Sequence, residues 1–262
     1  MADEVLQGVK TAIRIYEEVA TRRDPPSVRE LARDLDLNKS TVHRTLVTLE
    51  SCGWLRADDG GGWVITARAF SLGRRAADQG HLRSTVLPIM ERLRDETKES
   101  VHFMMPEGRD VVLMGRLESP HAVRTSYLVG ARGPLHATAN GKAILAHYDD
   151  AALDEYIAQG LSSSATRTLT DPAALRLELT RIRERGFASA VDELSDGASA
   201  AAAAILDPVG RPVASLSISV PTIRYGEGEQ ERYAELIAAA AKEAANRVYG
   251  QHAPGSSARA SG

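Results

Sequence analysis

The sequence has a single cysteine, no long apolar run and no excess of positive charge, and each of these absences excludes a class of protein. Cys52 is the only cysteine among 262 residues, which excludes an internal disulfide and a thiolate metal cluster. No apolar run approaches the roughly 18 residues that a membrane helix needs. Asp3 and Glu4 stand near the start, where no apolar signal-peptide core is present. We therefore expect a cytoplasmic protein with no membrane partner.

The charge balance excludes a strong, non-specific nucleic-acid binder. The formal net charge is −3, and residues 1–70 hold 10 Lys and Arg against 11 Asp and Glu. A near-neutral segment can still carry a locally basic face, so we expect any affinity for DNA to need two or more copies of the chain.

Motifs of catalysis and metal binding are also missing. The sequence has no Gly-x-Ser-x-Gly elbow, no Walker loop and no Rossmann fingerprint. The seven histidines are scattered, and no two of them stand at the spacing of a metal site. We expect no enzymatic activity, no cofactor and no metal, unless residues distant in the sequence assemble a metal site.

Residues 27–50 predict two short helices joined by a tight turn. Ser27 followed by Glu30 is a capping box, and Asn38 can cap the second helix. The apolar residues recur at helical spacing in both segments. The predicted buried stripe of the second helix is Val42, Leu46 and Leu49.

The outer face of the second helix is basic and hydroxylic, with no acid before Glu50. Such a helix can read the major groove of DNA, although the spacing alone leaves a plain helical hairpin open. After Gly53, apolar residues 54–55 and 63–65 flank a glycine-rich turn, which predicts a β-hairpin and hence a winged helix. The predicted DNA contacts are Ser27, Lys39, Ser40, Thr41, His43, Arg44, Thr45 and Arg56.

Two helices are expected on either side of this motif. Residues 5–20 have an amphipathic pattern, and residues 69–98 form a long helical connection that Pro88 should kink or restart. We expect a dimer interface to begin in the connection, with an unpartnered helix as the alternative. The predicted buried stripe of the first helix is Val5, Val9, Ile13, Tyr16 and either Val19 or Ala20.

From residue 99 the pattern is that of a mixed helix and sheet domain. The alanine-rich residues 198–206 have helix propensity, but a turn and an alternating segment follow them, so we predict a strand. The other predicted strands are 100–105, 110–117, 122–129, 187–193 and 212–220. The predicted helices start near 140 and cover 150–159, 172–185 and 227–249.

A binding site for an organic anion is predicted where a helix start and a strand meet. Ala139, Asn140 and Gly141 open a helix, whose free N–H groups favour a carboxylate. Ser217 and Ser219 alternate on a strand, so both hydroxyls point to one face, either this site or solvent. Lys142 is expected to be an exposed lysine.

Two stretches resemble the IclR family of bacterial transcription regulators, and together the resemblance covers residues 5 to about 250. The first carries Leu31-Ala32, Leu35, Leu37, Lys39-Ser40-Thr41-Val42-His43-Arg44, Leu46, Leu49-Glu50 and Gly53. The second carries Leu135-His136-Ala137-Thr138-Ala139, Gly141-Lys142-Ala143, Thr168, Thr170-Asp171-Pro172, Leu175, Arg185-Gly186-Phe187-Ala188 and Ser217-Ile218-Ser219.

The resemblance implies an α+β protein. A winged helix-turn-helix (1–67) leads through a linker helix (68–98) to a GAF/PAS-like effector domain with an antiparallel sheet (99–250), followed by a disordered tail (251–262). It implies a homodimer or a dimer of dimers that binds a palindromic DNA operator and a small carboxylate effector.

Two residues depart from the family pattern. Acid-sensing members carry Asp in the segment matched by Ala190 and Cys at the position matched by Ala200. Two methyl groups widen the pocket and make it less polar, which favours a bulkier, partly apolar acid such as an aromatic carboxylate over glyoxylate or pyruvate. The predicted effector contacts are Ala139, Asn140, Gly141, Ala190, Ala200, Ser217 and Ser219.

The function that we expect is ligand-responsive regulation of a catabolic or metabolic operon. Repression is the expected mode, because most members of the family repress, and activation is the alternative. A metabolite-binding protein or an enzyme whose N-terminal domain contacts proteins is the alternative from another class.

Overall fold

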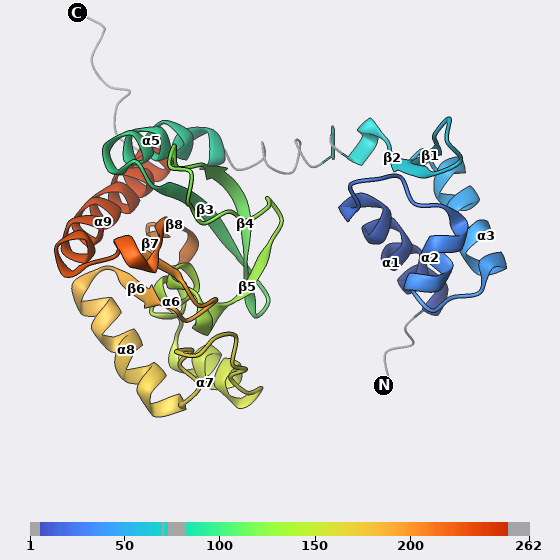
Figure 1. Cartoon of the computed structure of the whole chain (residues 1–262). Helices are drawn as coiled ribbons and strands as arrows, with labels where there is room; N and C mark the ends of the chain where they lie inside the picture. Colours follow the sequence, from blue (N-terminus) through green and yellow to red (C-terminus); the bar gives the residue numbers. More distant parts are fainter. Residues whose placement is uncertain (1–5, 70, 73–81, 251–262) are drawn as a thin grey trace, which may run out of the picture. The chain divides into compact units, whose positions relative to one another are not determined.

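The computed structural model describes residues 6–69, 71–72 and 82–250. The chain divides into two compact units, 1–80 and 81–262, and each is described by itself (Figure 1). The predicted tail, 251–262, lies outside the described residues, as do Val5 of the first predicted helix and residues 70 and 73–81 of the predicted linker helix. Within the described part, no helix is long and apolar enough to cross a membrane.

The N-terminal unit is the predicted winged helix. Its elements are α1 (Gln7–Thr21), α2 (Val28–Asp34), α3 (Lys39–Ser51), β1 (Leu55–Ala57) and β2 (Trp63–Ile65). The two strands pair antiparallel and form the wing. The core between helices and wing is apolar and is made by Ile15, Val19, Leu31, Ala32, Val42, Leu46, Leu55 and Trp63.

The start of α2 confirms the capping box. The Ser27 hydroxyl accepts from the Glu30 N–H, and the Glu30 carboxylate accepts from the Ser27 N–H at 2.8 Å. Asn38 holds the N-cap position of α3, but its side chain makes no capping hydrogen bond, so that part of the prediction is wrong.

The stripe predicted for α1 is only partly correct. Ile15 and Val19 are the buried residues of this helix, whereas Val9 and Ile13 are 55% and 52% exposed. The side of α1 that packs on α3 and β2 is centred on Ile15 and Val19, and Val9 and Ile13 point away from it.

The wing is attached to the proline turn between α1 and α2. The Trp63 N–H donates to the Pro26 carbonyl at 3.0 Å. Gly62 lies so close to this turn that a Cβ there would be 2.5 Å from the Pro25 carbonyl oxygen. Only glycine permits this approach of the two backbones.

The C-terminal unit is built on an antiparallel sheet with the strand order β5-β4-β3-β8-β7-β6. Its strands are β3 (Ser100–Glu107), β4 (Asp110–Leu117), β5 (Arg132–Pro134), β6 (Ala188–Val191), β7 (Ala198–Leu206) and β8 (Pro212–Pro221). The alanine-rich segment is therefore the predicted strand.

Helices cover both faces of this sheet. The helices α5 (Leu82–Thr97) and α9 (Glu227–Tyr249) pack on one face. The other face is covered by the short helices η1 (Leu135–Ala137) and α6 (Ala139–Leu145), with α7 (Asp150–Ala158) and α8 (Pro172–Arg185) outside them. Another short helix, η2 (Thr222–Arg224), follows β8.

The helix α5 continues through Pro88, so of the two predicted effects of this proline, a kink or a restart, the restart does not occur. The strand predicted at 122–129 is wrong. Residues 122–129 form no strand, because β5 takes the edge of β4 and side chains hold the segment instead. Thr125 donates to the Ser219 hydroxyl at 2.9 Å, and the Ser100 hydroxyl donates to the Thr125 carbonyl.

Candidate functional site

The outer face of α3 is exposed as the sequence predicts. Lys39, Ser40, Thr41, His43 and Arg44 are exposed, and Thr45 is half-buried. On the opposite side Val42 and Leu46 are fully buried and fix the helix to the core of the unit. Cations and hydroxyls on a helix anchored this way suit contacts to base edges and phosphates.

The other two predicted DNA contacts differ from each other. Arg56 is exposed on β1 of the wing. The Ser27 hydroxyl is already engaged, since it donates to the Glu30 carboxylate at 2.8 Å and accepts from the Glu30 N–H. Ser27 therefore positions α2.

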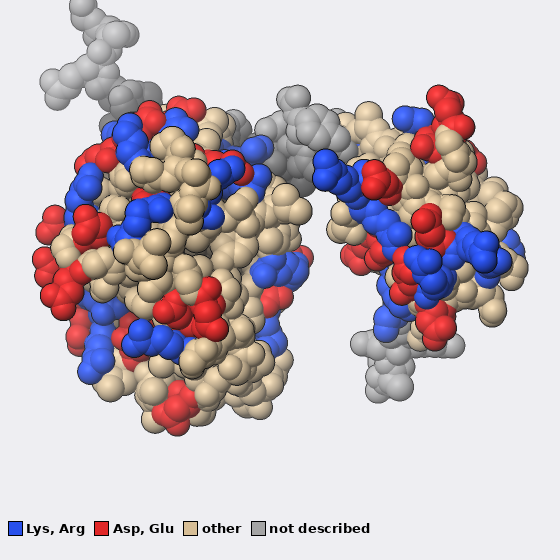
Figure 2. All heavy atoms as spheres, in the orientation of Figure 1, with Lys and Arg blue, Asp and Glu red and all other residues tan. Residues whose placement is uncertain are grey.

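The structure adds a basic residue that the sequence reasoning missed. Arg29, on α2, is exposed and borders a surface depression together with Arg33 and Lys39. Arg33 is paired with Asp34, so Arg29 and Lys39 are the cations of this depression without an ion pair among the described residues. Figure 2 shows basic and acidic side chains interspersed on the visible face of this unit, whose net charge is near zero. The sequence feature that could have identified Arg29 is its position in the first turn of α2. This turn borders the same depression as Lys39, the first residue of α3.

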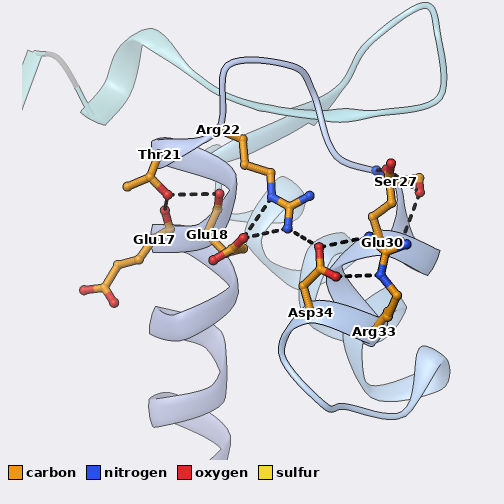
Figure 3. A network of polar contacts seen from close by, with 8 residues as sticks. All are labelled: Glu17, Glu18, Thr21, Arg22, Ser27, Glu30, Arg33 and Asp34. Carbon is orange, nitrogen blue, oxygen red and sulfur yellow. Dashed lines mark hydrogen bonds and ion pairs between the residues drawn. The ribbon is translucent and has the colours of Figure 1, made fainter.

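An ion-pair network joins α1 to α2 (Figure 3). Arg22 follows α1 and donates to the Glu18 carboxylate at 2.7 and 2.8 Å and to the carboxylate of Asp34, at the end of α2. Arg33 donates to the same carboxylate at 2.7 Å. The hydrogen bonds from Arg33 and Arg22 lower the pKa of Asp34 to about 2. The network fixes α2 against α1 through charges on the surface.

The C-terminal unit contains a cavity between the sheet and the segment that leads into α6. Its volume, taken as the space open to the centre of a water-sized sphere, is about 70 Å³. One wall is the sheet, with lining residues from β3, β4, β5, β6, β7 and β8, and the other is η1 with the start of α6. Its side chains include His102, Met104, Leu113, Tyr127, Thr138, Ala139, Asn140, Ala190, Leu194, Ala200, Ser217 and Ser219.

Six of the seven predicted effector contacts line this cavity: Ala139, Asn140, Ala190, Ala200, Ser217 and Ser219. The sheet register brings three of them together, because Ala190 pairs with Ala200 and Ala200 pairs with Ser219 on adjacent strands. Ser217 and Ser219 point to the same face, which is the cavity and not solvent.

Gly141 has a different role from the one predicted. It does not line the cavity, and a Cβ there would be 2.2 Å from the Leu135 carbonyl oxygen. Its N–H donates to the Thr138 hydroxyl at 2.9 Å, so this amide of the helix start is already satisfied. Gly141 lets α6 pack closely on η1.

The prediction for Lys142 is wrong. Its side chain is 1% exposed, and its ammonium group donates to both carboxylate oxygens of Glu193 at 2.6 and 2.7 Å. Burial raises the pKa of Glu193, and the Lys142 ammonium acts in the opposite direction. The sequence places Lys142 in the first turn of a short helix but does not show that β6 and the turn after it cover that turn.

The cavity contains a histidine that sequence reasoning missed. His102, on β3, is buried and lies across the β3–β8 ladder from Ser217. Its ring meets the Tyr127 ring edge-on, with centroids 5.9 Å apart. Burial, followed by the charge of Arg116, lowers the pKa of His102 to about 4. The sequence feature that could have placed His102 on one face of the sheet is the alternation of side-chain direction along the predicted strand 100–105.

His136, in η1, is buried but does not line the cavity. Its Nδ1 is 2.7 Å from the Tyr156 hydroxyl, and its Nε2 is 2.9 Å from the Ser162 carbonyl oxygen. It holds η1 against α7.

Comparisons with known proteins agree over nearly the whole chain. Residues 74–246 match the family model described as "Bacterial transcriptional regulator IclR C-terminal", and residues 12–59 match the "IclR helix-turn-helix domain". The Transcriptional repressor IclR of Escherichia coli is 29% identical, over 91% of this chain and 88% of the relative. The HTH-type transcriptional repressor AllR of the same species is 32% identical, over 90% of this chain and 88% of the relative.

A solved structure gives the same result. An IclR homolog from Microbacterium hydrocarbonoxydans, complexed with 4-hydroxybenzoate, superimposes with a TM-score of 0.81 at 26% identity. The superposition covers 92% of this chain and 98% of that one.

Proposed function

Since this chain belongs to the IclR family of bacterial transcriptional regulators, we propose that it is a cytoplasmic repressor whose binding to an operator responds to an organic acid. The outer face of α3 carries this proposal: it is exposed, basic and hydroxylic, and it is anchored by Val42 and Leu46. The two similar Escherichia coli proteins are both named repressors.

The reading helix contacts DNA through Lys39, Ser40, Thr41, His43, Arg44 and Thr45. Arg44 is the residue suited to specificity, because a guanidinium can bind guanine O6 and N7 together. Arg29 and Arg56 contact phosphates from α2 and from the wing, and Ser27 contributes by positioning α2.

The regulator acts as a homodimer or as a dimer of dimers on a palindromic operator. The near-neutral charge of residues 1–70 supports this, because one copy has too little excess positive charge for strong binding. Two reading helices on inverted half-sites supply both affinity and specificity.

The effector is a carboxylate with an apolar body, and an aromatic acid is the best candidate. Among the described residues that line the cavity no side chain is acidic, while Ser217 Oγ is buried without a hydrogen-bond partner. Ala190 and Ala200 leave room on the apolar side. The similar structure with 4-hydroxybenzoate supports an aromatic acid as a starting ligand.

Selection of binding sites from random DNA duplexes tests the DNA-binding role. We expect enriched duplexes with two inverted half-sites, and Arg44→Ala should lose about 1–3 kcal/mol of binding free energy per half-site on them but little on random DNA. Arg211→Ala is the control, because Arg211 is an exposed arginine in the β7–β8 turn of the other unit. Equal losses on selected and random duplexes would contradict the base-reading role of Arg44.

The effector is tested by thermal unfolding with carboxylates from glyoxylate and pyruvate to benzoates and phenylacetates. An acid at about 100 times its Kd should add about 2.7 kcal/mol to the free energy of unfolding. Stabilisation by glyoxylate or pyruvate alone would contradict an apolar effector, and the same acids should then be tested for release of the selected duplex.

A further inference from the structure

Ser217 Oγ is a buried polar atom of the cavity with no hydrogen-bond partner among the described residues. The His102 ring, buried on the neighbouring strand, lines the same cavity and meets the Tyr127 ring edge-on. Their neighbours are satisfied: Ser219 accepts from Thr125, and the Asn140 side chain donates to Ser215 at 3.0 Å. An unpaired buried polar group costs free energy, so its retention in a binding cavity indicates a partner that arrives with the ligand.

The two residues form a polar strip across the sheet. His102 on β3 is directly opposite Ser217 on β8, so both side chains stand on the same face. The next residue along this row is Ala202 on β7, and on the other side of His102 the partner is Arg116 on β4. Polarity therefore falls from the β4 side of the cavity to the β7 side.

The charged groups around His102 are all positive or paired. Arg116 is next to it on β4 and is bound to Glu118 at 2.9 Å and to the Tyr127 carbonyl. Arg132 lines the cavity and is bound to Glu107 and Asp110. From the remaining elements, Tyr127 and Asn140 face the cavity with neutral groups. This environment favours an anion and supplies no carboxylate that would compete with it.

We propose that His102 and Ser217 together bind the carboxylate of the effector, and that His102 takes up a proton from solvent when the acid binds. This inference rests on the proposed function of the cavity. Ser217 donates its hydroxyl hydrogen, and the protonated imidazole supplies both a hydrogen bond and the opposite charge that a buried carboxylate needs.

The environment of the free cavity explains why the proton arrives with the ligand. Burial and Arg116 hold the pKa of His102 at about 4, so the ring is neutral at pH 7 in the free protein. A carboxylate within about 4–6 Å favours the charged imidazole and raises the pKa. Between the pKa of the free and the bound form, affinity should therefore increase up to about tenfold for each unit that the pH falls.

Calorimetric titration of the full-length protein tests this with benzoate, 4-hydroxybenzoate and phenylacetate at pH 5.5, 6.5 and 7.5. Repeating each titration in buffers of different ionisation enthalpy measures the protons taken up. We expect tighter binding at lower pH and uptake approaching one proton at pH 5.5, where the free ring is still neutral and the bound ring is charged. His102→Gln should bind more weakly at pH 5.5 and lose the uptake, while the exposed control His121→Gln keeps both.

Ser217→Ala separates the two contacts and also guards against misfolding of the His102 variant. It should bind about tenfold more weakly at every pH while keeping the proton uptake. Binding without proton uptake, or uptake that persists in His102→Gln, would overturn the inference. If none of the three acids binds at any pH, the inference is also wrong, whereas operator binding that depends on Arg44 would leave the proposed regulator intact.

Discussion

Lys142 and Glu193 form an ion pair inside the C-terminal unit, where the ammonium lies 2.6 and 2.7 Å from the two carboxylate oxygens. Lys142 also donates to the Ser189 carbonyl at 2.8 Å. The pair joins α6 to the turn between β6 and β7, which carries Leu194 to the cavity. It therefore connects two segments that line the cavity, the start of α6 and the β6–β7 turn.

Removing one partner of this pair should be costly because the other is left as an unpaired buried charge. We expect Lys142→Met to lower the free energy of unfolding by about 3–5 kcal/mol, and Glu193→Gln to act in the same direction. The double variant should recover part of the loss. Urea unfolding of all four proteins gives the coupling energy, and single variants as stable as the parent would show that the pair does not hold the walls together.

The neutral state of His102 should make the stability of the free protein depend on pH. The unfolded chain binds a proton at His102 below about pH 6.5, but the folded protein does so only near pH 4. The folded-state pKa is depressed, so the contribution is present above pH 6.5 and is lost as the pH falls towards 4. We expect a loss of about 3 kcal/mol over that interval.

The comparison with His102→Gln isolates this contribution. Burial also lowers the pKa of His136 and His147, so the parent protein alone reports several histidines. The difference between parent and variant, measured by urea unfolding from pH 7.5 to 4.5, should change with pH in the direction given above. A difference that does not change with pH would contradict the buried neutral imidazole.

The network around Asp34 should hold α2 until strongly acidic pH. The hydrogen bonds from Arg33 and Arg22 depress the pKa of Asp34 to about 2, so their contribution is present above pH 4 and is lost between about pH 4 and 2. We expect Asp34→Asn to speed amide hydrogen exchange in residues 28–34 at neutral pH. Arg23→Gln, an exposed neighbour of Arg22, is the control and should leave that exchange unchanged.

Gly141 should be sensitive to substitution for a reason other than ligand binding. A methyl group there would meet the Leu135 backbone at 2.2–2.6 Å, and backbone cannot give way as a flexible side chain does. We expect Gly141→Ala to destabilise the protein by about 1–3 kcal/mol or more in thermal unfolding. Gly228→Ala, in a helix with no heavy atom within 4 Å of the added Cβ, should be neutral or stabilising by up to about 1 kcal/mol.

Local signals were sufficient for much of the fold. The capping box, which spans the four residues from Ser27 to Glu30, determines where α2 begins. The turn after residue 206 identifies the alanine-rich segment as a strand despite its helix propensity. Such signals depend on neighbours in the chain, so the sequence contains them in full.

The errors came from long-range packing. Periodicity shows that α1 has an apolar side, but which residues meet α3 and β2 depends on how the helices cross, and this is why Val9 and Ile13 were misplaced. Lys142 can be buried because it pairs with Glu193, which is 51 residues later in the sequence and lies beside it only in the folded chain. Six of the residues predicted as effector contacts line one cavity, because the helix start, the strand alternation and the family resemblance all pointed to the same place. His102 was missed because no motif contained it.

The contact between Gly62 and Pro25 has a mechanical consequence. With Gly62 packed against the proline turn and Trp63 hydrogen-bonded to Pro26, backbone contacts hold the wing to the α1–α2 connection. In the proposed regulator, a ligand signal would therefore have to move the winged helix as one body. Such a movement changes the distance between the two α3 helices of a dimer and leaves the shape of each winged helix as it is.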